Sequence, residues 1–144
     1  MLTKHADLTE KIIAAFYAVY NALGSGFLEK VYRNALALEL GKRGLDTQIE
    51  VPVRVYYGGV AVGEYFADLV VQRLVIVELK AVEKLLAEHE AQLVHYLRAT
   101  EFEVGLLLNF GPEPAVRRKI YDEEKKRARA GKYPLNPPSA PNSA

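Results

Sequence analysis

The sequence predicts an α/β (α+β) domain in which helices flank a mixed central sheet of about four to five strands. Apolar residues recur with helical spacing over 7–22 and 27–44, after which the period changes to two. A helical segment over 82–99 then separates a strand at 74–80 from an apolar strand within 103–111. Consecutive antiparallel strands followed by a helical crossover imply that antiparallel and parallel pairs share one sheet.

The two N-terminal helices are separated by the glycine-containing stretch LGSG. Asp7 or Thr9 is placed to cap the first helix, and the second is expected to end near Gly41 or Gly44. Each helix carries an apolar row that can pack on a sheet. The first row consists of Ile12, Ile13, Phe16, Val19 and Tyr20, and the second of Leu28, Val31, Leu36, Leu38 and Leu40.

The strand pattern begins at 47–57 with alternating apolar residues, and Pro52 within it suits an edge strand or a bulge. The turn YGGV joins this strand to the next, at 60–71, in a hairpin. The segment 112–121 is a candidate for one more edge strand. The alternating residues of the first strand are Ile49, Val51, Val53 and Val55.

Length and composition predict one domain over 1–121, followed by a tail over 122–144 that is first charged and then Pro/Ser-rich and partly disordered. The net charge of +1 argues neither for nor against a nucleic-acid partner. The absence of cysteine excludes disulfides, zinc–thiolate sites and iron–sulfur clusters. A charged N-terminus and the lack of an apolar run near the roughly 20 residues that span a bilayer predict a soluble, cytoplasmic protein with no membrane partner.

Charged residues interrupt what otherwise reads as two buried strands joined by a short turn, in FADLVVQRLVIVELK over 66–80. Asp68 and Glu78 each lie five residues from Arg73. A three-residue turn centred on Arg73 therefore places the two acids opposite each other, with Cβ atoms about 5 Å apart, and makes Phe66 and Lys80 the next pair. A two-residue turn would put the acids on opposite faces. The first register leaves the other face apolar; it carries Ala67, Leu69, Val71, Val75, Val77 and Leu79.

Two carboxylates at this separation repel each other unless a cation lies between them. Mg²⁺ fits, because it prefers oxygen ligands and commonly uses one or two carboxylates together with substrate phosphate. Lys80 points to the same side as Glu78 and is placed to orient an attacking water or to stabilise phosphorane charge. These residues around a metal would form a phosphodiester-cleaving site; the alternative is a buried ion pair between Lys80 and either acid.

Asp68 followed by Glu78-Leu79-Lys80 resembles the D…ExK signature of the PD-(D/E)XK nuclease superfamily, with Ala67 where that signature has proline. Further motifs follow the same order along the chain. Gln92-x-x-x-Tyr96 is similar to the QxxxY motif of RecB-like members, and Gly26-x-x-Glu29-x-x-Tyr32 resembles the motif that names the GxxExxY protein family, a branch of this superfamily. The resemblance extends over about residues 8–121.

The resemblance implies a restriction-endonuclease-like core and a deoxyribonuclease that depends on Mg²⁺ or Mn²⁺, with RNA as the other candidate substrate. It implies that Asp68 and Glu78 are metal ligands and that Lys80 is the catalytic lysine. Glu29 would be a further acidic catalytic residue that points at the metal or at Lys80. The expected substrate contacts are Tyr32, Arg33, Gln92 and Tyr96.

A non-catalytic nucleic-acid-binding or assembly module on the same fold is the alternative function. The small size leaves no room for a separate recognition domain, so a homodimer or a targeting partner is expected. His89 and His95 are six residues apart and do not share a helical face, which argues against a metal-binding pair. The basic runs 117–119 and 125–132, with Arg98, are candidates for contacts to a phosphate backbone.

Overall fold

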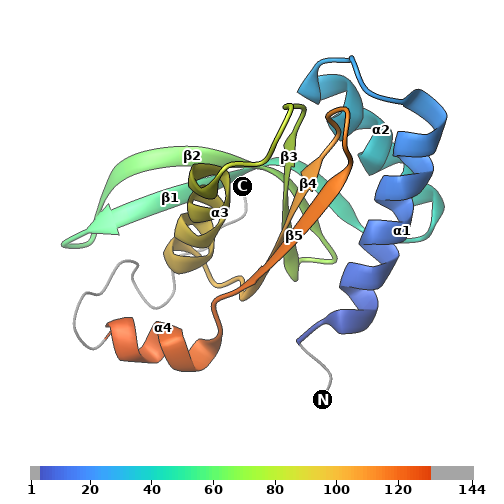
Figure 1. Cartoon of the computed structure of the whole chain (residues 1–144). Helices are drawn as coiled ribbons and strands as arrows, with labels where there is room; N and C mark the ends of the chain where they lie inside the picture. Colours follow the sequence, from blue (N-terminus) through green and yellow to red (C-terminus); the bar gives the residue numbers. More distant parts are fainter. Residues whose placement is uncertain (1–3, 131–144) are drawn as a thin grey trace.

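The computed structural model describes residues 4–130, in which helices flank one five-stranded sheet on both faces (Figure 1). The strand order is β1-β2-β3-β4-β5, and all neighbours are antiparallel except the parallel pair β3 and β4. The predicted mixed sheet is confirmed, with α3 as the crossover of the parallel pair. The elements are α1 (Ala6–Leu23), α2 (Glu29–Lys42), β1 (Thr47–Tyr57), β2 (Val60–Val71), β3 (Val75–Lys80), α3 (Ala87–Ala99), β4 (Val104–Asn109), β5 (Ala115–Ile120) and α4 (Glu123–Ala130).

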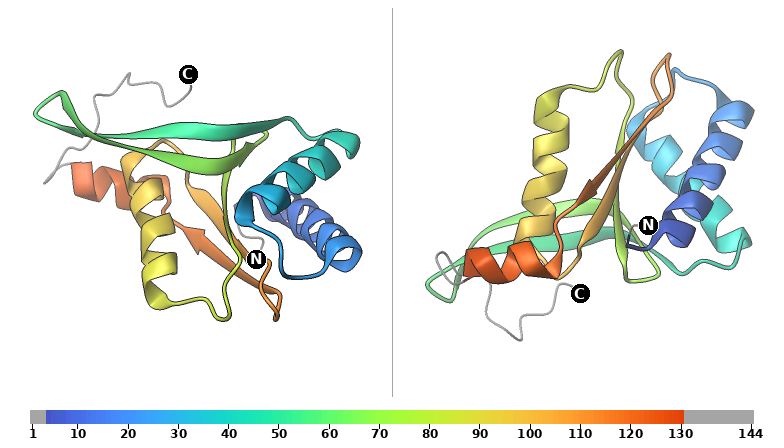
Figure 2. Two further views of the ribbon diagram at one scale, coloured as in Figure 1. Left: turned by 90° about the horizontal axis from the view of Figure 1, so that it is seen from above. Right: turned by 60° about the horizontal axis from the view of Figure 1, so that its bottom comes forward.

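The sheet separates two hydrophobic cores. Phe16 of α1 and Leu79 of β3 belong to the core on the side of α1 and α2. Leu93 of α3 and Ile76 of β3 belong to the core on the other side. Figure 2 shows α3 and the α1–α2 pair on opposite sides of the central strands. Because successive residues of a strand point to opposite faces, Glu78 lies on the side of α3, like Ile76.

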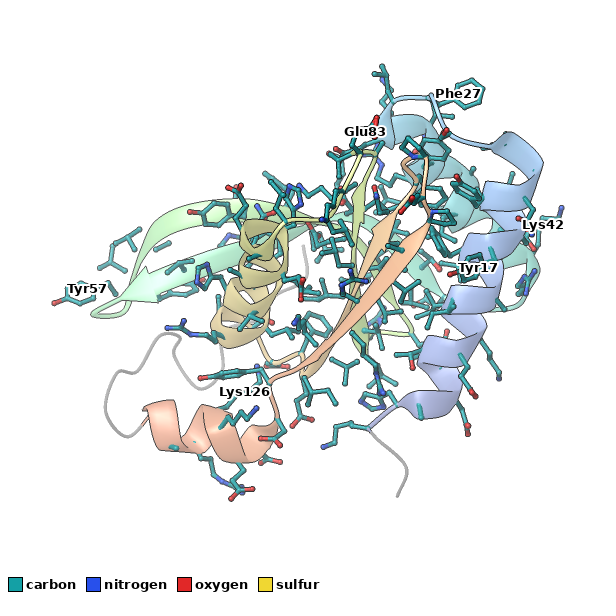
Figure 3. All side chains as sticks on the ribbon, in the orientation of Figure 1. Tyr17, Phe27, Lys42, Tyr57, Glu83 and Lys126 are labelled. Carbon is teal, nitrogen blue, oxygen red and sulfur yellow. The ribbon has the colours of Figure 1, made fainter. Side chains whose placement is uncertain are left out.

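β1 and β2 form a long hairpin that extends past α3, with Tyr57 at its tip (Figures 1 and 3). Pro52 lies on β1, which is an edge strand as its sequence indicated. The predicted alternation fails at Glu50, whose φ of 53° is in the left-handed region and turns the chain within the strand. As a result Val51 is buried beside α3, whereas Ile49 is 44% exposed.

The same irregularity reaches β2, where Ala67 pairs with Val51. Ala67 packs in the core beside α3, whereas Leu69 packs in the core beside α1 and α2. The prediction that Ala67 shares the apolar face of Leu69 is therefore wrong. The rest of that face is confirmed; Leu69, Val71, Val75, Val77 and Leu79 all belong to the core beside α1 and α2.

Two predictions about helix starts are wrong. α1 begins at Ala6 with His5 as its N-cap residue, and neither Asp7 nor Thr9 caps it. The Thr9 hydroxyl instead donates to the Ala6 carbonyl at 3.1 Å. α3 begins at Ala87, so the expected helical residues 82–86 form the connection that follows β3.

The apolar row of α2 also differs from the prediction. Tyr32, Leu36 and Leu40 are fully buried, and their spacing of four residues defines the packed face. The predicted row is therefore confirmed at Leu36 and Leu40 only. The residues that the prediction placed inward wrongly are exposed; they are Leu28 (77%), Val31 (39%) and Leu38 (68%).

α4 is attached to the end of α3 through Lys126. The Lys126 ammonium donates to the carbonyls of Leu97 and Thr100, the second at 2.6 Å, and lies 5.6 Å from the centre of the Tyr121 ring. Figure 3 shows Lys126 above α4, on the side of α3. The expected disorder of the Pro/Ser-rich segment falls outside the described residues. No helix within 4–130 is long and apolar enough to cross a membrane.

Candidate active site

The turn between β2 and β3 sets the two acids against each other. Its three residues, 72–74, leave Val71 paired with Val75 and Leu69 paired with Val77. This is the register predicted for a turn centred on Arg73, and continuing it by one residue sets Asp68 against Glu78. The ladder between the two strands ends at Leu69 and Val77, so the predicted pairing of Phe66 with Lys80 is absent from the described residues.

Where the backbone pairing of β2 with β3 ends, at Leu69 and Val77, the carboxylates of Asp68 and Glu78 accept the next hydrogen bonds in place of backbone carbonyls. Oε2 of Glu78 accepts a hydrogen bond from the Asp68 backbone N–H at 2.8 Å, and Oδ2 of Asp68 accepts one from the Leu79 backbone N–H at 2.8 Å. These reciprocal bonds fix both side chains across the hairpin. Within residues 4–130, the second oxygen of each carboxylate accepts no hydrogen bond. One oxygen of each acid is therefore free to bind a ligand.

Burial makes this carboxylate pair costly to ionise. The Glu78 side chain is almost fully buried, and burial, with a smaller contribution from the Asp68 charge, raises its pKa to about 8. Burial also raises the pKa of Asp68, against the opposing effects of the Leu79 N–H, Lys80 and Arg33. A cation between the two oxygens would favour both ionised forms, so the pair is arranged to gain from binding one.

Lys80 and Glu29 lie within electrostatic range of this pair. Lys80 lowers the pKa of Asp68, Glu78 and Glu29, in each case less than burial raises it. Glu29 begins α2, and its pKa is raised by burial and, to a smaller extent, by Asp68, although the residue keeps exposed surface. The start of α2 and the end of β3 thus bring Glu29 and Lys80 to one site from distant parts of the sequence.

Gln92 and Tyr96 contribute from α3. The Gln92 amide nitrogen donates to the Tyr96 hydroxyl oxygen at 3.2 Å. Burial, followed by the charges of Glu78 and Asp68, raises the pKa of Tyr96 to about 12. The hydroxyl therefore stays protonated at neutral pH. Because its oxygen accepts from Gln92, its own proton remains available for an acceptor in the site.

Tyr32 does not belong to this surface. Its ring is fully buried and stacks on Phe110 with ring centres 4.4 Å apart. Its hydroxyl donates to the Gly24 carbonyl at 2.6 Å and accepts from the Phe27 N–H at 3.1 Å. The prediction that Tyr32 contacts substrate is therefore corrected: Tyr32 anchors the glycine-containing connection 24–28, which leads directly to Glu29.

Arg33 lies near the carboxylates but is paired. Its guanidinium forms an ion pair with Glu50 at 3.1 Å, and its charge lowers the pKa of Asp68. Glu50 has a left-handed backbone conformation and lies between Ile49 and Val51, which pair with the two neighbours of Asp68 in β2. The Nε of Arg33 is buried and has no hydrogen-bond partner among the described residues. Arg33 thus links α2 to β1 through Glu50 and places a positive charge near Asp68.

Asn109, which the sequence prediction did not single out, fixes the chain just after Lys80. Its amide oxygen accepts from the N–H groups of Val82 and Gly111, at 3.0 and 3.1 Å, and its amide nitrogen donates to the Val82 carbonyl at 2.9 Å. A Cβ on Gly111 would lie 1.8 Å from the Val82 carbonyl oxygen, so the two backbones touch here. The only sequence signal was a polar residue in the apolar run VGLLLNFG.

The donors present suit a hard divalent cation. Asp68 and Glu78 each offer one carboxylate oxygen, and Mg²⁺ commonly uses one or two carboxylates while keeping several waters. Within the described part of the chain, no three His, Asp or Glu side chains are grouped closely enough to hold a metal ion. Asp68 and Glu78 are therefore the two carboxylates that would hold such a cation, and Glu29 lies within electrostatic range of Asp68.

Comparison with known proteins shows the family and the fold of this chain. The family model described as the PD-(D/E)XK nuclease superfamily matches residues 6–120. Among solved structures, the crystal structure of SSO0001 is similar, with a TM-score of 0.50 and 19% sequence identity. The similarity covers 89% of this chain and 66% of that one, slightly under two thirds of its length, and at this identity it shows the fold alone. A search of curated proteins found no match.

Proposed function

The chain belongs to the PD-(D/E)XK nuclease superfamily, and on that premise we propose that it is a Mg²⁺- or Mn²⁺-dependent nuclease that hydrolyses phosphodiester bonds in DNA. The observation that supports this most strongly is the reciprocal bonding of Asp68 and Glu78 to each other's strand. It holds a buried and a partly buried carboxylate side by side with one oxygen of each left over, at a cost in desolvation that a bound cation would offset.

In this proposal each side chain has a separate task. Asp68 and Glu78 hold the metal, which when bound supplies positive charge that polarises the phosphodiester. Lys80 orients the attacking water or stabilises the charge that develops on the phosphate. Glu29 completes the acidic cluster from α2. The Tyr96 hydroxyl keeps its proton and donates a hydrogen bond to a phosphate oxygen, while the Gln92 amide donates to the same hydroxyl and fixes it.

The motifs GxxExxY and QxxxY support a finer placement, in the GxxExxY branch and near RecB-like nucleases. That placement favours DNA over RNA, and an exonuclease or an action on single strands or on flapped and other structured DNA. A domain built on one five-stranded sheet offers little surface for reading a sequence. We therefore propose low sequence specificity, or a second copy or partner protein that supplies targeting.

The test is cleavage of labelled single-stranded, duplex and flapped DNA and of RNA, with Mg²⁺ and then Mn²⁺. Asp68→Asn keeps an oxygen for the Leu79 N–H but removes the charge, and Lys80→Met keeps the aliphatic chain. Both should lose more than about a hundredfold in rate. Glu64→Gln, on the exposed part of β2, is the matched control and should cut like wild type.

Each other outcome has a definite meaning. Cutting that persists in both Asp68→Asn and Lys80→Met would show that this site does not perform it. Retention of DNA in a shift assay without cutting by wild type would favour the non-catalytic binding module. Cutting of RNA alone would replace DNA as the substrate while leaving the roles of the side chains intact.

A further inference from the structure

A pocket of about 400 Å³ lies between the β1–β2 hairpin and α3, and Gln92 and Tyr96 of the candidate active site line it. This volume is within the usual range for small-molecule sites, about 300–1,000 Å³. Figure 1 shows the β1–β2 hairpin passing next to α3, and side chains from both elements line the pocket. The pocket is therefore large enough to hold one small flat ligand.

The walls of the pocket differ in chemistry. Val53 and Val55 of β1 form an apolar side, and the Tyr65 ring of β2, 51% exposed, adds an aromatic surface. The rings of Tyr65 and Tyr96 have centres 5.8 Å apart and are tilted by 40°, so they form one continuous aromatic corner. Flat aromatic ligands stack on such surfaces, because every nucleobase presents a π-face.

The α3 side of the pocket supplies polar groups. His95 and Arg98 line it, and Arg98 forms no ion pair with a carboxylate of the described residues. An imidazole can bond the edge of a base, and a free guanidinium can bind a phosphate oxygen. Gln92 and Tyr96 line the pocket as well, and the charges of Glu78 and Asp68 contribute to the raised pKa of Tyr96. The pocket therefore shares two side chains, Gln92 and Tyr96, with the candidate active site.

We propose that this pocket binds one unstacked nucleobase of the DNA strand next to the phosphate that is cut, with the base on Tyr65 and a neighbouring phosphate on Arg98. The inference rests on the proposed function, since it places the base by reference to that site. It narrows the substrate to DNA with an unpaired nucleotide, because a base within a duplex is not available to stack on Tyr65. Frayed ends, flaps and single strands all satisfy this requirement.

The experiment measures binding of a labelled single-stranded DNA by anisotropy, with Ca²⁺ in place of Mg²⁺. An abasic nucleotide is moved along the strand. For wild type, removing the base at one position should weaken binding about tenfold, the effect of one stacked base. Tyr65→Ala should weaken binding of the intact strand by a similar factor, and the abasic strand should then bind no worse than the intact one. Tyr65→Phe should behave as wild type.

Tyr57→Ala, at the hairpin tip and 78% exposed, is the matched control and should leave the abasic effect unchanged. An abasic effect that is equal in wild type and Tyr65→Ala, or absent from wild type, would overturn the proposal, as would an effect seen only with RNA. The same strands tested for cutting in Mg²⁺ separate the two claims. If the protein cuts DNA but the abasic effect does not depend on Tyr65, the proposed nuclease activity holds and the base-binding pocket is refuted. If the abasic effect depends on Tyr65 but no DNA is cut, the pocket holds and the nuclease activity is refuted.

Discussion

Each carboxylate of the pair Asp68 and Glu78 uses one oxygen for a structural hydrogen bond and keeps the other available for a ligand. One oxygen of each bonds a backbone N–H across the hairpin, and the other is free among the described residues. This explains how a buried acid, Glu78, and a partly buried one, Asp68, are tolerated within apolar strands. Their position could be predicted from the sequence, because five residues on either side of Arg73 and an apolar opposite face select one register. The two hydrogen bonds from backbone N–H groups to these carboxylates could not be predicted, because they depend on where the backbone pairing of β2 with β3 ends.

The metal-free protein should lose stability as pH rises. The pKa of Glu78 is about 8 in the folded protein against 4.5 ordinarily, so the folded state keeps a proton that the unfolded chain has lost between those values. The free energy of unfolding should therefore fall from about pH 5 to about pH 9, by roughly a few kcal/mol, with Asp68 contributing in the same direction.

Urea unfolding followed by circular dichroism in the presence of EDTA measures this. Glu78→Gln, which has no proton to lose, should remove most of the pH dependence and be more stable than wild type at the alkaline end. Glu64→Gln serves as the control. A wild-type stability that is flat or increases over this range would show that Glu78 is ionised in the folded protein without a metal.

At the scale of elements, the connection after β3 shows why some boundaries could not be predicted. Residues 82–86, VEKLL, have helical composition, but α3 begins only at Ala87. Both backbone groups of Val82 are bonded to the Asn109 amide and are not available to a helix. Asn109 lies 27 residues away in sequence, so local pattern carries no trace of this contact. The connection instead holds the end of β3, and with it Lys80.

Asn109→Ala should destabilise the protein by about 2–4 kcal/mol, because it leaves the N–H groups of Val82 and Gly111 and the Val82 carbonyl without their partner. Urea unfolding gives the value. Asn21→Ala, at an exposed position of α1, is the control and should be near neutral. A cost for Asn109→Ala no larger than that of the control would mean that the connection is held by other contacts.

α4 carries its own prediction. Lys126→Met keeps the aliphatic chain but removes the donors to the last carbonyls of α3, and should cost about 1–2 kcal/mol. Lys125→Met is the control, because Lys125 is exposed and its side chain has no partner among the described residues. Thermal unfolding compares the two. Equal melting temperatures for both variants would indicate that α4 does not stabilise α3.

At the scale of the whole molecule, the candidate site lies on the central sheet, and a hydrophobic core packs on each face of that sheet. α1 and α2 pack beneath Leu79, and α3 packs beside Ile76, so the strand that bears Glu78 and Lys80 is fixed on both faces. Periodicity was sufficient to predict the sheet, its crossover and most strand bounds. Periodicity did not predict the burial of Tyr32 or the left-handed backbone of Glu50, because both depend on packing between elements distant in sequence.

Binding of Mn²⁺ measured by titration calorimetry tests the central claim most directly. Wild type should show one site, and Asp68→Asn and Glu78→Gln should each weaken it by at least about tenfold, since each removes one of the two charged ligands. Glu64→Gln should bind as wild type. If wild type binds no Mn²⁺, or if both neutral variants bind it as tightly as wild type, Asp68 and Glu78 do not form the metal site.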